Sequence, residues 1–220
     1  MNYHYFLKET CLIGKFMKSN LNTNKIYANS FISRENWSVL NRHKSILLLL
    51  TGISGSGKTA LAFALEKQLY FLDCRAVVLD GDIVRQGLCS DLKYTDNDRT
   101  ENLRRVGEIS KYFVDAGIIV LASFIAPTKV SRNLLKEKVG SNNFLEIYLN
   151  CPIEVCEERD VKGLYKKARA GGIPNFTGIS SKYEKPLNSD LSIDSSKISI
   201  NESVNRVVKL LTNIGVIYEN

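Results

Sequence analysis

The chain has 220 residues, of which 44% are hydrophobic, so it is long enough to bury one full core and we expect one domain with an appendage. Its formal net charge of +7 favours polyanionic partners such as nucleotides, nucleic acids or anionic lipids, without choosing among them. The N-terminal stretch has no unbroken apolar run and no later run is long enough to cross a bilayer, so we expect no signal peptide, no membrane span and a cytoplasmic location.

Residues 1–42 are rich in Asn, Ser and Lys and show no sustained periodicity. We interpret them as an N-terminal arm or extension. From residue 43 onward, apolar runs alternate with amphipathic stretches, which is typical of strands followed by helices. Residues 43–220 are therefore expected to form the main domain.

The apolar run Ile46–Leu50 leads into a glycine-rich turn that ends in Lys58 and Thr59. Five consecutive aliphatic residues predict a central strand that is buried on both faces. The glycines let backbone N–H groups converge on one point, and a helix that begins near Thr59 adds the positive end of its dipole. The turn is therefore expected to bind an anion.

The spacing of this turn, Gly-x-x-x-x-Gly-Lys-Thr, is that of a phosphate loop between a strand and a helix. In such a loop Lys58 reaches the β- and γ-phosphates of ATP, and the Thr59 hydroxyl holds Mg²⁺. An ordinary glycine-rich turn is the alternative, but it would not need the lysine. The predicted ATP-binding residues are Gly52, Ile53, Ser54, Gly55, Ser56, Gly57, Lys58 and Thr59.

Further strands are expected at residues 76–80, 118–125, 144–150 and 191–193, and further helices at 95–116, 129–139 and 202–211. One more helix is expected after the strand at 144–150, with Pro152 in its first turn. Together with the helix after the phosphate loop, this alternation predicts a three-layer α/β/α fold with a central parallel sheet, like that of the nucleoside-monophosphate kinases. Ligands are expected at the carboxyl ends of the strands. Residues 160–186 are basic and glycine-rich, so we expect them to form a mobile lid.

An acceptor for the phosphoryl group is expected near Asp80-Gly81-Asp82, at the end of the strand at residues 76–80. In a doubly wound sheet this strand end opens into the same crevice as the phosphate loop. Asp82 is our candidate to orient an incoming hydroxyl group and accept its proton. The alternative is a turn that only caps the strand and the following helix.

Four arginines follow closely in the sequence. Arg85 and Arg99 lie where loops turn into helices and are candidates for forked recognition of an anionic substrate. Arg104 and Arg105 lie on the polar face of an amphipathic helix, where solvated charge is the common case.

Two aromatic residues flank this region, Tyr94 before the helix and Phe176 within the expected lid. Each alone is more often a packing residue. Next to anion-binding arginines, the pair would stack on a base, which indicates a nucleotide as the acceptor as well as the donor.

Four stretches together closely resemble the adenylyl-sulfate (APS) kinase family: GISGSGKT at 52–59, LDGDIVR at 79–85, DRTENLRRVGE at 98–108 and RDVKGLYKKARAG at 159–171, the last followed by NFTG at 175–178. The resemblance implies transfer of the ATP γ-phosphate to the 3′-hydroxyl of adenosine 5′-phosphosulfate (APS), giving 3′-phosphoadenosine 5′-phosphosulfate (PAPS) in sulfate assimilation. It also implies a requirement for Mg²⁺, a homodimer, and ATP sulfurylase as a possible partner in the same pathway.

The resemblance also assigns roles to single positions. Asp82 matches the catalytic aspartate, and Arg85 and Arg99 match arginines that bind the phosphosulfate. Tyr94 and Phe176 match the two rings that stack on the adenine of APS. The complete set of substrate-binding positions implied by the resemblance is Asp82, Arg85, Tyr94, Arg99, Asn102, Ile125, Ala126, Lys162 and Phe176.

Three positions depart from the family pattern. Tyr94 stands where the family usually has Phe, which keeps the ring and adds a hydroxyl group. Gln86 replaces a common His. Ala126 replaces a Ser that is sometimes proposed to be phosphorylated, and a methyl group excludes such a step, so we expect direct in-line transfer.

Two alternatives remain open at this point. One is a kinase of the same fold that acts on another nucleotide conjugate, such as a phosphoramidate used in modifying surface polysaccharides. The other is a catalytically idle nucleotide-binding subunit. We expect no nucleic-acid partner, because the positive charge is not accompanied by a nucleic-acid-binding motif.

Overall fold

The computed structural model describes residues 32–218, so most of the predicted arm at residues 1–42 lies outside the described residues. Five strands form one parallel sheet in the order β2-β3-β1-β4-β5. Every residue of the central strand β1 is buried, as its uniform aliphatic sequence predicted. The strands are β1 (Leu47–Thr51), β2 (Ala76–Asp80), β3 (Ile119–Ser123), β4 (Phe144–Asn150) and β5 (Leu191–Asp194).

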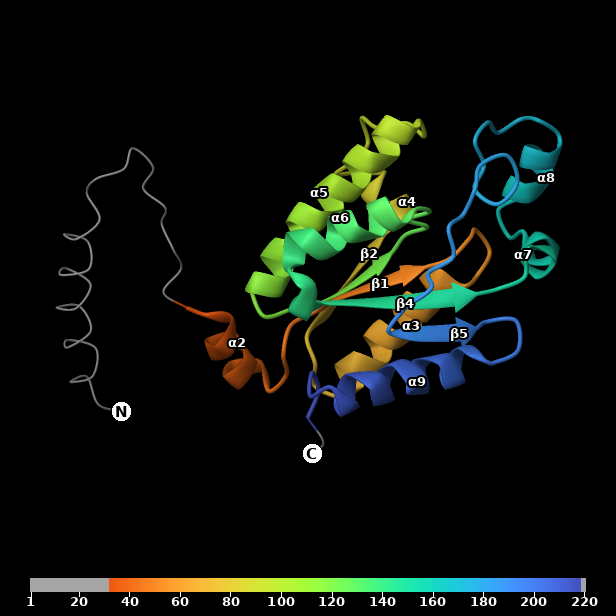
Figure 1. Ribbon diagram of the computed structural model, residues 1–220. Helices are drawn as coiled ribbons and strands as arrows, with labels where there is room; N and C mark the ends of the chain where they lie inside the picture. The colour runs from red at the N-terminus through yellow and green to blue at the C-terminus, as the bar shows by residue number, and fades with distance from the viewer. Residues whose placement is uncertain (1–31, 219–220) are drawn as a thin grey trace, which may run out of the picture. The chain divides into compact units, whose positions relative to one another are not determined.

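Helices cover both faces of this sheet (Figure 1). On one face lie α5 (Asp96–Asp115) and α6 (Lys129–Val139), and on the other lie α3 (Lys58–Phe71) and α9 (Ile200–Asn213). Successive residues of β1 point to opposite faces, so Leu47 and Leu49 pack with α5 and α6 while Leu48 and Leu50 pack with α3 and α9. The predicted three-layer α/β/α fold is thereby confirmed.

Three of the longer helices, α5, α6 and α9, begin after hydroxyl-bearing N-cap residues, whereas α3 begins after Gly57 of the phosphate loop. Thr95 caps α5 by accepting a hydrogen bond from the backbone N–H of Asp98, and Ser199 caps α9 in the same way through Glu202. Thr128 caps α6 and forms a full capping box with Ser131. These caps fix where the amphipathic helices start.

Three helices were not predicted. α4 (Gly81–Val84) and α8 (Leu164–Arg169) are only 4 and 6 residues long, too short to show a helical period. α2 (Arg34–Asn41) begins with a capping box at Ser33, but it contains no fully buried residue and so lacks an apolar stripe in the sequence. A 3-10 turn at Ser141–Asn143 precedes β4.

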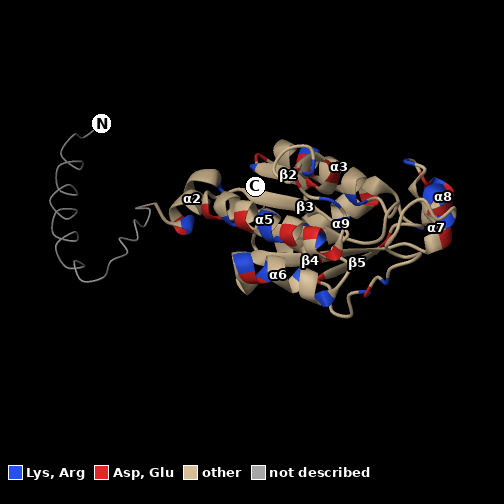
Figure 2. Ribbon diagram, turned by 90° about the horizontal axis from the view of Figure 1, so that it is seen from above, with Lys and Arg blue, Asp and Glu red and all other residues tan. Residues whose placement is uncertain are grey.

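The carboxyl ends of the strands face a set of short elements. α7 (Ile153–Arg159) follows β4, α8 comes next, and the chain then returns through a long loop to β5 (Figure 1). Lys and Arg residues make up half of α8 (Leu164–Arg169), which belongs to the predicted lid and is largely blue in Figure 2. Within residues 32–218, none of the helices has both the length and the apolar composition that crossing a bilayer requires.

Candidate active site

The phosphate loop, residues 52–59, follows β1 and runs directly into α3. Gly52 has a φ of 152°, and a Cβ at this position would lie 2.7 Å from the carbonyl oxygen of Leu149. Gly55 has a φ of 76°, and its Cβ would lie 2.8 Å from the carbonyl oxygen of Cys156. Both positions therefore require glycine, for the backbone angle and for the close approach of the neighbouring chain.

Lys58 is the first residue of α3 and folds back over this loop. Its Nζ donates a hydrogen bond of 2.8 Å to the carbonyl oxygen of Ile53. Burial lowers the pKa of Lys58 to about 8, an effect that Cys156 and Asp80 oppose. The triphosphate of a bound nucleotide would stabilise the charged form further, so Lys58 is placed to pair with it.

Asp80 connects the phosphate loop to the end of β2. Its carboxylate is buried, with Oδ2 accepting a hydrogen bond of 2.7 Å from the Thr59 hydroxyl and Oδ1 one of 3.0 Å from the backbone N–H of Asp82. The phosphate loop and the end of β2 therefore lie in direct contact. Asp80 was not assigned a role of its own from the sequence, although an acidic residue at the end of a strand next to a phosphate loop was a usable signal.

Asp82 has a different environment from Asp80. Its side chain is 58% exposed and forms an ion pair with Lys162, which is itself 59% exposed. Lys162 comes from the predicted lid, between α7 and α8. The charges of Asp82 and Lys162 also act on the pKa of Lys58, so all three side chains lie in one region. Of the two carboxylates, that of Asp82 is therefore the accessible one.

Arg85 and Tyr94 lie together in the segment between α4 and α5. The Arg85 guanidinium lies 4.4 Å from the centroid of the Tyr94 ring, and its Nη1 donates to the carbonyl oxygen of Lys93 at 2.7 Å. Tyr94 is 64% exposed. Sequence reasoning placed these two side chains at one site, and the structure brings them into contact.

Arg99 joins this segment to the lid. Its Nε donates to the carbonyl oxygen of Tyr94 at 3.0 Å, and its two terminal nitrogens donate to Asn175 O at 2.8 Å and Thr177 Oγ1 at 3.1 Å. Phe176, between these two lid residues, is buried. Arg99 thereby links the chain segments of the two aromatic residues that were predicted to stack on a base.

Phe176 packs on the lid itself. Its ring meets that of Tyr165 edge to face with 5.0 Å between the centroids, and the Tyr165 hydroxyl donates to the carbonyl oxygen of Ser54 at 2.8 Å. The lid therefore rests directly on the phosphate loop.

Asn102 of α5 and the pair Ile125–Ala126 after β3 are the remaining predicted substrate-binding positions. Asn102 is only 4% exposed, and its side chain lies at the Cys89 thiol, where burial raises the pKa of the thiol and Asn102 helps to lower it. Ile125 accepts a hydrogen bond of 2.6 Å from the Thr51 hydroxyl, and the Ala126 carbonyl accepts one of 3.2 Å from Arg132.

Arg159 is a further contact that the sequence analysis missed. Its two terminal nitrogens donate to Gly55 O at 3.3 Å and Ser195 O at 2.7 Å. It therefore ties the phosphate loop to the segment after β5. Its place in the sequence gave no sign of this, because the two partners lie far from it along the chain.

These features define a class of protein. A parallel sheet in this strand order, a phosphate loop between β1 and α3, and a basic lid over the strand ends make the chain a P-loop kinase of the three-layer α/β/α kind.

Comparisons with known proteins narrow this class. The family model of adenylylsulphate kinase matches residues 44–194. An adenylyl-sulfate kinase of Acaryochloris marina is 46% identical over 201 residues, which cover 91% of this chain and 97% of that protein. One from Shewanella baltica (strain OS155) is 51% identical over 172 residues, covering 78% of this chain and 84% of that protein.

Among solved structures, that of the Mycobacterium tuberculosis APS kinase CysC in complex with AMPPNP and APS is similar, with a TM-score of 0.74 and 40% identity. The match covers 77% of this chain and 98% of that chain. The chain belongs to the adenylyl-sulfate kinase family. The family resemblance inferred from the sequence is therefore confirmed.

Proposed function

We propose that this protein transfers the γ-phosphoryl group of ATP to the 3′-hydroxyl of APS, producing PAPS and ADP for sulfate assimilation. The observation that supports this most directly is the contact chain from Thr59 through Asp80 to Asp82, which joins the donor loop to the acceptor carboxylate. Membership of the adenylyl-sulfate kinase family supports APS as the acceptor.

On the donor side, the backbone N–H groups of residues 52–59 bind the phosphates, and Lys58 exchanges its bond to Ile53 for one to the β- and γ-phosphate oxygens. The oxygens of Thr59 and Asp80 fit Mg²⁺, which prefers hard oxygen ligands and retains some of its water. We propose that Thr59 would contact Mg²⁺ and that Asp80 would orient the Thr59 hydroxyl. When bound, Mg²⁺ supplies charge neutralisation between the β- and γ-phosphates.

On the acceptor side, Asp82 orients the 3′-hydroxyl and accepts its proton late, as a loose transition state permits. Lys162 then stays near the transferring group, where it balances negative charge. Arg85 and Arg99 now donate to backbone carbonyl oxygens, which phosphosulfate oxygens would replace with stronger, charge-assisted bonds.

The remaining predicted residues complete the acceptor site in this proposal. Tyr94, which is exposed, and Phe176, which now packs on Tyr165 and must turn toward the ligand, are the two rings proposed for the adenine, and Asn102 is proposed as a hydrogen-bond donor. Ile125 and Ala126 contact the substrate beneath them. Since Ala126 has no hydroxyl group, phosphoryl transfer goes directly from ATP to APS without a phosphoserine.

We further propose a homodimer located in the cytoplasm, with ATP sulfurylase as the pathway neighbour that supplies APS. Exposed apolar side chains on α2, Val39 at 81% and Leu40 at 70%, are available for self-association. A reducing compartment fits the four cysteines of the described residues, which are all free and buried.

The proposed function is tested by measuring ADP release with APS and with other nucleotide conjugates, including a phosphoramidate, as acceptors. We expect APS to raise ADP release far above the rate without an acceptor, and PAPS to form in equal amount. Turnover with a different conjugate and none with APS would show that the acceptor has been assigned wrongly. No turnover with any acceptor, at saturating ATP and Mg²⁺, would favour an idle nucleotide-binding subunit.

A further inference from the structure

The segment at residues 85–95, between α4 and α5, includes two residues of the proposed acceptor site, Arg85 and Tyr94. It contains no long helix or strand, and its buried anchor is Cys89, which is fully inaccessible in the core under α5. The rest of the segment is largely exposed. Backbone turn hydrogen bonds shape the segment, and contacts from α5 then fix where it lies on the core, together with Arg85 and Tyr94.

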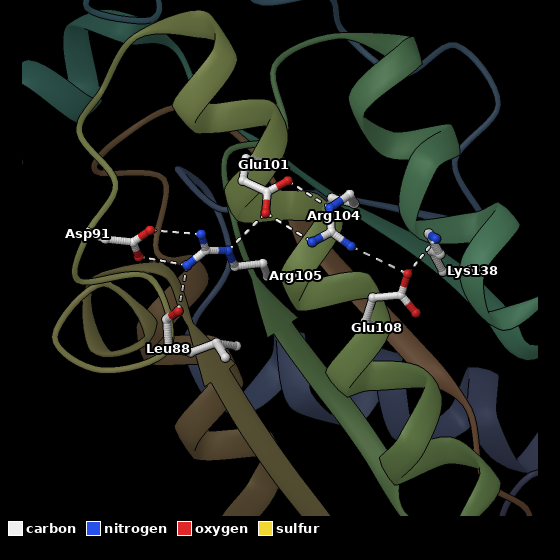
Figure 3. Close-up of polar contacts among 7 residues, drawn as sticks. All are labelled: Leu88, Asp91, Glu101, Arg104, Arg105, Glu108 and Lys138. Atoms are coloured by element: carbon white, nitrogen blue, oxygen red, sulfur yellow. Dashed lines mark hydrogen bonds and ion pairs between the residues drawn. The ribbon is translucent and has the colours of Figure 1, made fainter.

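Arg105 of α5 provides such contacts. Its Nη1 and Nη2 donate to the two oxygens of Asp91 at 2.6 and 2.8 Å, and Nη1 also donates to the carbonyl oxygen of Leu88 at 3.0 Å (Figure 3). On its other edge, Nε donates to Glu101 of α5 at 2.9 Å. One guanidinium group thus fastens both the backbone and a side chain of the segment to a helix of the core.

The contacts continue from Asp91 to the acceptor residues. The next two carbonyl groups, of Leu92 and Lys93, accept hydrogen bonds from Arg85 Nη1 at 3.3 and 2.7 Å. The same guanidinium lies 4.4 Å from the centroid of the Tyr94 ring. Arg105 is therefore linked through consecutive residues of the segment to both acceptor side chains, although it touches neither.

Arg104, the adjacent residue, makes a different set of contacts. In the described part of the chain its ion pairs are with Glu101, at 2.7 Å, and Glu108, at 3.6 Å, both on α5. Glu108 in turn pairs with Lys138 of α6 at 2.6 Å (Figure 3). Arg104 and Arg105 thus share Glu101 and the same helix, but only Arg105 bonds to the segment at 85–95.

The contacts of Arg105 are better defined in geometry than those of a typical surface ion pair. Isolated exposed ion pairs contribute little, whereas forked pairing of a guanidinium with a carboxylate inside a network fixes direction as well as distance. The Arg105 side chain is 27% exposed. Hydrogen bonds to Asp91 and Glu101 raise the pKa of Arg105. The hydrogen bonds from Arg104 and Arg105 lower the pKa of Glu101 to about 2. All these groups therefore stay charged over the working pH range.

We propose that Arg105 is a positioning residue for the acceptor: by clamping Asp91 and Leu88 to α5, it holds Arg85 and Tyr94 in the arrangement that binds the nucleotide. This inference rests on the proposed function, because it takes Arg85 and Tyr94 to be acceptor contacts. It assigns a role in substrate affinity to a charge that the sequence pattern alone assigned to a solvated helix face.

The test compares Arg105→Gln with the matched control Arg104→Gln, measuring kcat and KM for APS and for ATP by coupled ADP release. For Arg105→Gln we expect KM for APS to rise about tenfold, with kcat and KM for ATP within about twofold of the wild type. The tenfold rise lies between the effect of losing a screened surface ion pair and that of losing a well-formed charged hydrogen bond. For Arg104→Gln all three constants should stay within about twofold. Asp91→Asn should raise KM for APS as Arg105→Gln does, and the double variant should be no worse than either single one.

Arg105→Lys tests the geometry without removing the charge, and it keeps the experiment informative if Arg105→Gln folds poorly. A lysine cannot pair with Asp91 in a fork while bonding to Leu88, so its KM for APS should be intermediate. Equal changes in KM for APS and ATP, or equal effects of Arg104→Gln and Arg105→Gln, would overturn the proposal and leave only a stabilising role. Absence of APS turnover by the wild type would overturn the proposed function and this inference together, whereas normal wild-type turnover with an unchanged KM for APS in the variants would overturn this inference alone.

Discussion

The donor and acceptor sides of the site are built in opposite ways. The donor side consists of backbone held by the core: residues 52–59 run from a fully buried strand into α3, and Gly52 and Gly55 lie so close to neighbouring carbonyl oxygens that no side chain fits. The acceptor side consists of long side chains from separate segments, including Asp82 and Lys162, which are both more than half exposed.

This difference bears on how each side responds to a ligand. The N–H groups of the phosphate loop are fixed by the fold before the nucleotide arrives, so little reorganisation is needed. On the acceptor side, Arg85, Arg99 and Lys162 are each bonded to protein groups that a substrate would have to replace. We therefore expect donor-side changes to abolish turnover, and acceptor-side changes to act in a graded way on affinity and rate.

The largest expected effect is that of Lys58→Ala. It removes the cationic side chain of the phosphate loop. Burial at this position strengthens the attraction between that charge and a bound phosphate. We expect kcat to fall about 10³-fold or more, by analogy with the loss of other charges at a transferring phosphoryl group. Steady-state ADP release measures kcat, and the thermal unfolding midpoint controls for folding. A loss below tenfold in a folded variant would contradict the role of Lys58.

Asp80→Asn and Asp82→Asn separate the two sides more finely. Asp82→Asn should lower kcat about 10²-fold at any Mg²⁺ concentration, because the amide can orient a hydroxyl group but cannot take its proton. Asp80→Asn weakens the hold on Thr59, so its activity should recover in part as Mg²⁺ is raised. The measurement is ADP release as a function of Mg²⁺ concentration. If Asp82→Asn were the variant rescued by Mg²⁺, the roles of the two carboxylates would be exchanged.

The same contrast explains what could be predicted from the sequence. The five strands and the longer helices were predicted because burial on two faces or on one stripe leaves a period in the sequence, and the phosphate loop because a local backbone shape requires glycine at fixed spacing. Arg105 was placed on a solvated face because its partners Leu88 and Asp91 lie 17 and 14 residues away, a separation that no helical period reports. The same holds for Arg159, which is bonded to residues far from it along the chain.

The smallest expected effect lies away from both sides, at His43 near the start of β1. His43 is fully buried, its Nε2 accepts a hydrogen bond of 2.9 Å from the backbone N–H of Arg75, and its Nδ1–H donates to the carbonyl oxygen of Lys44 at 3.0 Å. Burial lowers the pKa of His43, so the folded state favours the neutral ring. If Nε2 were protonated, it could no longer accept the hydrogen bond from Arg75, and two N–H groups would face each other.

The stabilising contribution of neutral His43 is therefore complete above the pKa of an unfolded histidine, near 6.5, and is lost as the pH falls below it. We expect the free energy of unfolding, from urea titrations, to drop by about 1 kcal/mol more between pH 7 and pH 5.5 in the wild type than in His43→Gln, whose amide oxygen still accepts from Arg75 without titrating. His4→Gln, the change at the chain's other histidine, is the control and should keep the wild-type dependence. His43 joins the strand ends that lie opposite the site. This loss of stability should therefore leave the ratio of KM for APS to KM for ATP unchanged in the molecules that remain folded. If the ratio shifted with pH in the wild type but not in His43→Gln, the sheet would transmit strain from this end to one side of the site.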